Sequence, residues 1–208
     1  MSTFLILILL IASYFIGSIP FGLILTRLFG YGDIRHMGSG NIGATNVLRT
    51  GNKALAAATL ALDALKGASV IFMVAIVAPQ DMDVLLLGLV AGVLAVLGHM
   101  FPLWLKFKGG KGVATFFGMI TAALPLCGII FASLWLLSAG ITRRSSAGAL
   151  LACAGALGTL VTFYILNLVA LSSVMAVLAI VLLIFYKHRE NIRRLLNGTE
   201  PKIGQRTS

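Results

Sequence analysis

Acidic side chains are scarce in this sequence. Its 208 residues contain 6 Asp and Glu against 16 Lys and Arg, and charged residues of both signs make up only 11% of the chain. Hydrophobic residues make up 59%, and the mean hydropathy is +1.03. So little polar material cannot cover the surface of a soluble globule. The composition therefore predicts a polytopic membrane protein in a single domain, residues 1–208.

Cysteine is also rare, and Cys127 and Cys153 both lie inside apolar runs. Their spacing indicates neither a disulfide framework nor a metal site, so we expect buried free thiols. The chain also lacks a basic region before its first apolar run and a small-residue cleavage site after it. We therefore expect that run to be a retained span rather than a signal peptide. No metal and no cofactor is expected.

The net charge of +10 is distributed in short loops between the apolar runs. This is typical of cytoplasmic loops that face anionic headgroups or anionic substrates, and it argues against a nucleic-acid partner. The predicted spans cover residues 4–28 (kinked at Pro20), 54–78, 84–105, 113–141 (interrupted at Pro125) and 147–186. The last run is long enough for two spans at 1.5 Å per residue.

The basic loops also decide the predicted topology. If residues 113–141 cross twice, as two short helices, every Lys and Arg except Lys66 lies on one side, which the positive-inside rule identifies as the cytoplasm. The sequence thus predicts an all-α integral membrane protein, a polytopic bundle of about seven transmembrane helices. Two of these are short, with the N-terminus outside and the C-terminus inside. The alternative for the two short helices is a tilted or partly re-entrant pair.

Two charged residues, Asp63 and Lys66, fall inside the second predicted span at i and i+3, on one helix face. Charges inside a membrane are paired or face a polar cavity. The sequence leaves open whether this pair is functional or only satisfies itself. The histidines His36, His99 and His188 are all predicted near the cytoplasmic face.

Residues 38–49 are the most polar segment between the apolar runs. Their glycines free backbone N–H groups to bind phosphate, Ser39 and Thr45 add hydroxyl donors, and Arg49 adds a fork that fits a phosphoryl oxygen pair. We interpret the segment as an anion cradle. Its G-x-G-x-x-G spelling also matches the dinucleotide fingerprint, but a long apolar helix candidate precedes it and no strand pattern follows.

Two further polar clusters share the predicted cytoplasmic face. Residues 106–112 hold a second glycine-rich basic turn, in which glycines would expose backbone amides and Lys111 would add a point charge. It is not a Walker motif, because Lys111 is followed by Gly112. A membrane-surface turn with interfacial lysines is the alternative. In the third cluster, His188 and Asn191 lie at i and i+3, and a histidine there can bind an anion when protonated or accept a proton when neutral.

Three segments, in order, resemble the bacterial acyl-phosphate-dependent glycerol-3-phosphate acyltransferases of the PlsY type. They are residues 38–46, residues 98–102 leading into 106–115, and residues 188–192. The resemblance spans essentially the whole chain. It implies a bacterial inner-membrane enzyme with a cytoplasmic active site, acting in the first step of phospholipid synthesis. The enzyme would move a fatty acyl group from acyl phosphate to the 1-position of glycerol 3-phosphate, giving lysophosphatidic acid and inorganic phosphate.

The interpretation of the polar segments as anion-binding sites agrees with this resemblance. Both substrates carry phosphate, and the donor has an apolar tail that suits a lipid-facing bundle. No H-x-x-x-x-D motif is present, so the soluble-type acyltransferase dyad is absent. The predicted catalytic residues are Ser39, Lys111, His188 and Asn191. The predicted substrate-binding residues are Gly38, Gly40, Asn41, Gly43, Ala44, Thr45, Asn46, Arg49, Lys108, Gly109, Gly110, Gly112, Arg143 and Ser145.

Direct transfer is the expected mechanism, because acyl phosphate is already activated and needs mainly positioning and charge stabilisation. Ser39, the cradle amides and Lys111 would hold phosphoryl and carbonyl oxygens. His188 and Asn191 would orient glycerol 3-phosphate, aided by Arg49 or Arg143. A covalent route through Ser39 is the mechanistic alternative. A transporter or channel for phosphate or an organophosphate is the functional alternative, although a pathway needs polar residues on the outer half too.

Overall fold

The structure, a computed structural model, describes residues 3–79 and 81–205. The described residues form helices and no strands, which confirms the all-α prediction. In chain order the helices are α1 (Thr3–Gly17), α2 (Phe21–Leu28), η1 (Ile34–His36), α3 (Ala44–Val47), η2 (Leu48–Thr50), α4 (Lys53–Val77), α5 (Val84–Met100), η3 (Leu103–Leu105), α6 (Val113–Ala123), α7 (Pro125–Thr142), α8 (Ser145–Ile165), α9 (Leu171–Lys187) and α10 (Arg189–Leu196).

Four segments of the described chain are long and apolar enough to cross a membrane: α4, α5 with its extension to Leu105, α7 and α8. The pair α1 and α2, bent by 43°, and the pair α9 and α10, bent by 60°, raise the number to six. The shorter apolar helix α6 is the remaining segment, and its 11 residues fall short of spanning length, so the structure supports four to six spans and a seventh stays a prediction. Of the two helices predicted to be short, α6 has 11 residues and α7 has 18.

The predicted break in residues 113–141 lies at Leu124, between α6 and α7. Pro125 occupies the first turn of α7, where the missing backbone N–H costs nothing and the fixed φ favours a helix start. The kink predicted at Pro20 is likewise present, as the break between α1 and α2.

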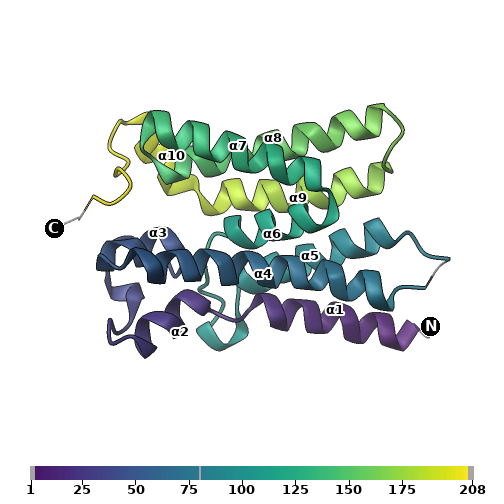
Figure 1. Ribbon diagram of the computed structural model, residues 1–208, viewed down its shortest axis with the longest axis horizontal. Coiled ribbons are helices and arrows are strands. Elements are labelled where there is room, and N and C mark those ends of the chain that lie inside the picture. The colour runs from purple at the N-terminus through teal and green to yellow at the C-terminus, as the bar shows by residue number, and fades with distance from the viewer. Residues whose placement is uncertain (1–2, 80, 206–208) are drawn as a thin grey trace.

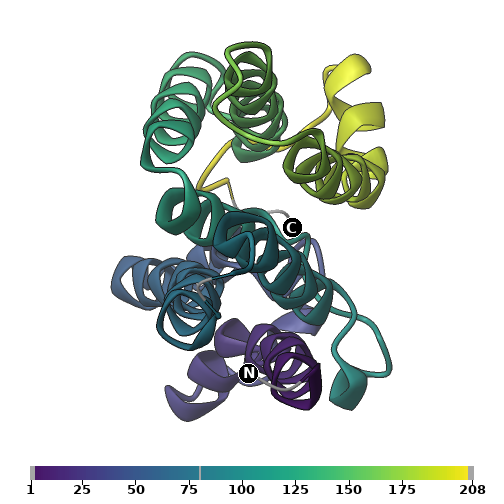
Figure 2. The same cartoon turned by 90° about the vertical axis from the view of Figure 1, so that its right-hand side faces the viewer.

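The helices form two layers with α6 between them (Figures 1 and 2). One layer holds α1, α4 and α5, the other holds α7, α8 and α9, and α6 contacts α4, α5, α7 and α8. Phe116, Met119 and Ile120 of α6 are fully buried. The backbones of α4 and α6 approach closely because Gly118 has no side chain: a Cβ there would lie 1.8 Å from the carbonyl oxygen of Ala64. Such contacts between small residues are how helices pack in a membrane.

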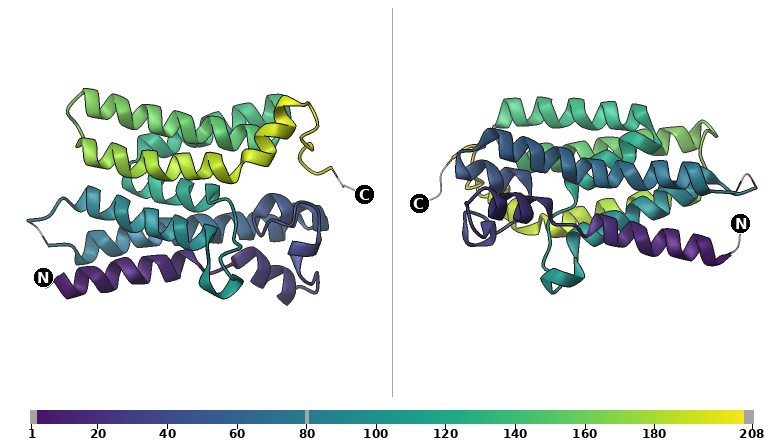
Figure 3. Two further views of the ribbon diagram at one scale, coloured as in Figure 1. Left: turned by 180° about the vertical axis from the view of Figure 1, so that it is seen from behind. Right: turned by 60° about the horizontal axis from the view of Figure 1, so that its bottom comes forward.

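The polar segments gather toward one end of the bundle. Figure 1 shows the N-terminal end of α1 on the right, and the loop before α4, the α7–α8 turn and the C-terminal tail on the left. The loop that carries η3 folds back beside the break between α1 and α2 (Figure 3). Two bonds fasten it there: Tyr14 Oη donates to the Phe101 carbonyl at 2.7 Å, and Trp104 Nε1 donates to the Ser18 carbonyl at 2.7 Å.

The start of α1 and the tail up to residue 205 lie at opposite ends of the bundle (Figure 1), which fits an odd number of crossings, and the side that faces the cytoplasm stays a prediction. We expect a cysteine at Thr199, in the exposed tail, to react with an impermeant maleimide only from the cytoplasmic side. A cysteine at Met82, in the α4–α5 turn, should react only from the outside. Background labelling will be low because Cys127 and Cys153 are buried. The reverse pattern would refute the predicted orientation.

Candidate active site

The first glycine segment is shaped from inside by Asn46. This side chain is buried, and its Nδ2 donates to the carbonyls of Ile34 at 3.0 Å, Met37 at 3.0 Å and Asn41 at 2.8 Å. Its Oδ1 accepts from the amide of Ser39 at 3.1 Å and from the Ser39 hydroxyl at 3.3 Å. All its polar atoms therefore serve the loop, so Asn46 fixes the shape of the cradle rather than offering a group to a ligand.

The surface of this loop carries the groups predicted to bind an anion. The amides of Gly43, Ala44 and Thr45 donate to no other described residue, and the side chain of Ser39 is exposed. Gly38 has φ +52°, and a Cβ there would lie 2.4 Å from Cδ of Arg49. Glycine therefore serves two purposes at this position: it takes the left-handed conformation and leaves room for the arginine.

The second glycine turn is built differently from what its sequence suggests. The amide of Gly109 donates to the Met100 carbonyl at 3.1 Å, and the amide of Gly110 donates to the His99 carbonyl at 3.0 Å. These two amides cap the end of α5 and are not available to an anion, contrary to our expectation. Gly112 has φ +84° and leads directly into α6. The glycines thus set the path of the turn, and Lys111 is the group that the turn presents. Lys108 is exposed.

Lys111 belongs to a hydrogen-bonded chain that ends on a carboxylate. Its Nζ donates to Oδ1 of Asn191, and Nδ2 of Asn191 donates to Oε1 of Glu200 at 2.6 Å. Glu200 also accepts from Ser146 Oγ at 2.6 Å and from Arg194 Nε at 2.7 Å. Asn191 and Glu200 are both buried. The two ends of the carboxamide are therefore assigned by charge, with the oxygen toward the cation and the nitrogen toward the anion.

His188 lies at the bend between α9 and α10, 3% exposed. Its Nδ1 is 2.8 Å from the carbonyl oxygen of Ile184, which can only accept, so the ring proton is on Nδ1 and Nε2 is left as a proton acceptor. Burial, aided by the nearby Lys111 cation, lowers the pKa of His188 to about 4. Of its two predicted roles, proton acceptor when neutral and anion binder when protonated, the structure favours the first at neutral pH.

The first glycine segment and the Lys111 cluster meet through the start of α8. Thr45 Oγ1 lies 3.0 Å from Ser145 Oγ, and the next residue, Ser146, bonds to Glu200. Arg143, predicted to aid binding, is exposed, and its side chain bonds to none of the described residues. Polar contacts thus link segments that lie far apart in the sequence at this end of the bundle.

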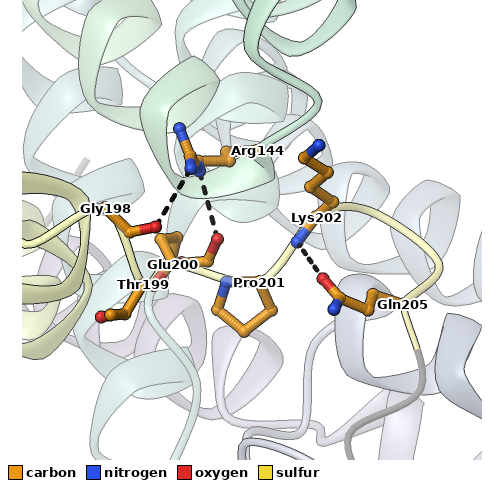
Figure 4. Close-up of a pocket in the computed structure, with 7 residues that line it drawn as sticks. All are labelled: Arg144, Gly198, Thr199, Glu200, Pro201, Lys202 and Gln205. Atoms are coloured by element: carbon orange, nitrogen blue, oxygen red, sulfur yellow. Dashed lines mark hydrogen bonds between the residues drawn. The ribbon is translucent and has the colours of Figure 1, made fainter.

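A hollow of about 360 Å³ lies between Arg144 and the C-terminal tail (Figure 4). Arg144 lies on one side of it, donating from Nε to the Glu200 carbonyl at 3.1 Å and from Nη2 to the Gly198 carbonyl at 3.4 Å. The tail residues Gly198, Thr199, Glu200, Pro201, Lys202 and Gln205 complete the lining. Arg144 therefore pins the tail that carries Glu200. Within the described residues, no group of three His, Cys, Asp or Glu side chains could hold a metal ion.

Comparison with known proteins assigns the chain to one family. The glycerol-3-phosphate acyltransferase family profile matches residues 7–198. The chain belongs to the glycerol-3-phosphate acyltransferase family. It is 52% identical to the glycerol-3-phosphate acyltransferase of Agrobacterium fabrum over 193 residues, 93% of this chain and 89% of the relative. It is 51% identical to that of Brucella canis over 195 residues, 94% of this chain and 92% of the relative.

Solved structures confirm the PlsY-type resemblance. The chain is similar to the crystal structure of PlsY, an integral membrane glycerol 3-phosphate acyltransferase, in its glycerol 3-phosphate form. The TM-score is 0.85 at 35% identity, over 95% of this chain and 94% of that one. For the lysophosphatidic acid form of PlsY the TM-score is 0.80 at 34% identity, with the same coverage. Membership in the acyltransferase family and the membrane-embedded fold are thus established together.

Sequence reasoning missed Glu200, Ser146 and Arg144. A signal for Glu200 was available, because the chain has only 6 acidic residues and two of them, Glu190 and Glu200, lie in its basic tail. Such a carboxylate is surrounded by potential partners, and in this acyltransferase Glu200 accepts bonds from three side chains. No comparable signal distinguishes Ser146 from its neighbour Ser145.

Lys111 gives this site a testable pH dependence. Burial lowers its pKa to about 8, although Glu200 opposes the shift, so the lysine loses its charge at a lower pH than usual. If the cation binds substrate, kcat/KM should fall as pH rises through about 8. Lys111→Arg should abolish this alkaline limb, because a guanidinium stays charged there. Lys106→Arg, an exposed change in the same turn, is the control and should keep the limb. An identical limb in Lys111→Arg would assign it to another group.

Proposed function

We propose that this protein transfers a fatty acyl group from acyl phosphate to the 1-position of glycerol 3-phosphate. The products are lysophosphatidic acid and inorganic phosphate, and the reaction is the first step of phospholipid synthesis. The observation that carries this proposal is that Lys111, bonded to Asn191, and the buried His188, three residues before Asn191, lie together at the end of an apolar bundle. An anion with an apolar tail fits such a place, with its head on the polar surface and its chain against the helices.

The reaction needs no covalent intermediate. The acceptor hydroxyl oxygen attacks the acyl carbon, a new ester C–O bond forms, and the bond from the acyl carbon to the phosphate oxygen breaks. Nε2 of His188, or a substrate phosphate oxygen, takes the hydroxyl proton. Lys111 and the amides of residues 43–45 stabilise the charge on the phosphoryl and carbonyl oxygens. Arg49 or Arg143 contributes to binding glycerol 3-phosphate.

The surroundings of Ser39 support direct transfer over an acyl-serine. Its hydroxyl lies 3.3 Å from Oδ1 of Asn46, and a carboxamide oxygen is no general base. A serine nucleophile is activated by an adjacent base. No titratable side chain among the described residues hydrogen-bonds to Ser39, so its proposed part is to donate to a substrate oxygen. Trapping a labelled acyl group on Ser39 would overturn direct transfer.

The first test is lipid synthesis by the purified protein in detergent. With acyl phosphate and glycerol 3-phosphate we expect lysophosphatidic acid and inorganic phosphate in equal amounts. Acyl-CoA and acyl-carrier protein should give none. Product from either of these donors alone would overturn the proposed donor. Phosphate uptake into liposomes without acylation would instead identify a transporter. We place the active site on the cytoplasmic face of the bacterial inner membrane, where glycerol 3-phosphate is available.

Variants of the third cluster test the site itself. His188→Ala and Asn191→Ala should each lower the rate by ~10²–10⁴-fold, the usual cost of losing a group that deprotonates or positions an acceptor. Arg193→Ala is the matched control on α10, because Arg193 is exposed and its side chain bonds to no described residue. It should retain most activity. The measurement needs saturating and subsaturating glycerol 3-phosphate, to separate kcat from KM. Equal, mild effects at all three positions would mean that α10 only anchors the protein to anionic lipid.

A further inference from the structure

A second polar cluster lies inside the bundle. Asp63 and Lys66 of α4 and His99 of α5 are each 2–4% exposed. Lys66 Nζ is 2.7 Å from Asp63 Oδ1, 2.9 Å from His99 Nδ1 and 2.8 Å from the Ile19 carbonyl oxygen, at the break between α1 and α2. An ammonium has three N–H donors, and all three are used here. The sequence left open whether Asp63 and Lys66 only satisfy each other, and the contact with His99 extends the pair toward the active site.

The cluster reaches the second glycine turn through His99. Lys66 is paired with Asp63, and as an ammonium ion it can only donate, so we assign the bond from Lys66 to Nδ1 of His99 and the ring proton to Nε2. That edge of the ring lies against Gly110: a Cβ at Gly110 would be 2.0 Å from Nε2. The His99 carbonyl also accepts from the Gly110 amide at 3.0 Å. Both the ring and the backbone of His99 thus hold the residue that precedes Lys111.

We propose that Asp63, Lys66 and His99 are positioning residues that fix the Gly110 turn and so aim Lys111 at the substrate. The inference rests on the proposed function of Lys111 in binding an anion. The tip of Lys111 is held by Asn191, and the backbone next to Gly110 sets the point from which this flexible side chain starts. Lys66 holds the ring of His99 in one orientation, and Asp63 balances the charge of Lys66. Removing one member leaves a buried polar group unpaired and releases the ring.

A double-mutant cycle with Lys111→Ala tests this coupling, because residues that act as a unit show strongly non-additive losses. His99→Gln and the charge-balanced pair Asp63→Asn with Lys66→Met are made alone and with Lys111→Ala. Alone, each should lower kcat/KM about 10–100-fold and divide the loss between kcat and KM as Lys111→Ala does. In the Lys111→Ala protein, each should lower it further by less than about 3-fold.

Leu160→Ala on α8 is the control for a purely structural loss, since Leu160 is fully buried in the core and lies on a helix that does not form the turn. Its fold-loss should be the same with Lys111 present or absent. Equal fold-losses for the cluster variants in both backgrounds would overturn the inference and leave the proposed function standing. Normal turnover by Lys111→Ala itself would overturn the proposed function as well. If the charge-balanced pair fails to fold, His99→Gln, which removes no charge, decides the matter alone.

Discussion

The carboxylate of Glu200 is the constraint on which the active site depends. It joins three parts of the chain: the start of α8 through Ser146, α10 through Asn191 and Arg194, and the tail that carries Glu200 itself. Burial alone would raise the pKa of Glu200, but the bonds from Ser146, Asn191 and Arg194 lower it, so the carboxylate is held charged. A buried carboxylate without these donors would be costly. Its charge in turn orients the Asn191 carboxamide toward Lys111.

This arrangement explains how a largely apolar bundle holds a buried polar cluster at one end. The helices α4 and α6 pack closely through Gly67 and Gly118, and Lys111, just before α6, bonds to Asn191 of α10. The breaks between helices supply further polar groups. Ile19 lies in the break between α1 and α2, and His188 lies at the bend after α9. Backbone that leaves the helix can offer unpaired groups, and in a membrane protein it is tolerated only where protein or water covers it.

Much of the fold could be predicted because it follows from local properties. Apolar runs of spanning length gave the helices, Pro20 and Pro125 gave the breaks, and the basic loops gave one polar end. His188 and Asn191, predicted to share a helix face, are both buried, although His188 lies at the bend before α10 and not within a helix. Each of these inferences depends on the composition or spacing of continuous segments and on no contact between distant ones.

The remainder could not be predicted because it depends on partners from distant segments. A glycine-rich turn exposes its amides only if nothing else accepts from them, and in Gly109 and Gly110 the end of α5 does. Asn46 has the chemistry of a ligand-binding residue, yet carbonyls of its own loop use its donors. Glu200 resembles a solvated tail residue until Ser146 and Asn191 are brought to it by the fold. Sequence identifies which groups are available, and the tertiary structure decides which of them remain free.

Lys111 and His188 carry different charges at neutral pH, although burial lowers the pKa of both. Burial lowers the pKa of both groups, to about 8 and about 4, so at pH 7 the lysine is charged and the histidine is neutral. The charge of Lys111 itself contributes to the low pKa of His188. A phosphate bound at Lys111 would offset that charge, and the pKa of His188 would rise toward the range in which a histidine accepts a proton efficiently. If Lys111 binds the phosphate and His188 takes the proton, as proposed, an anionic substrate would make His188 a better base in the step that follows.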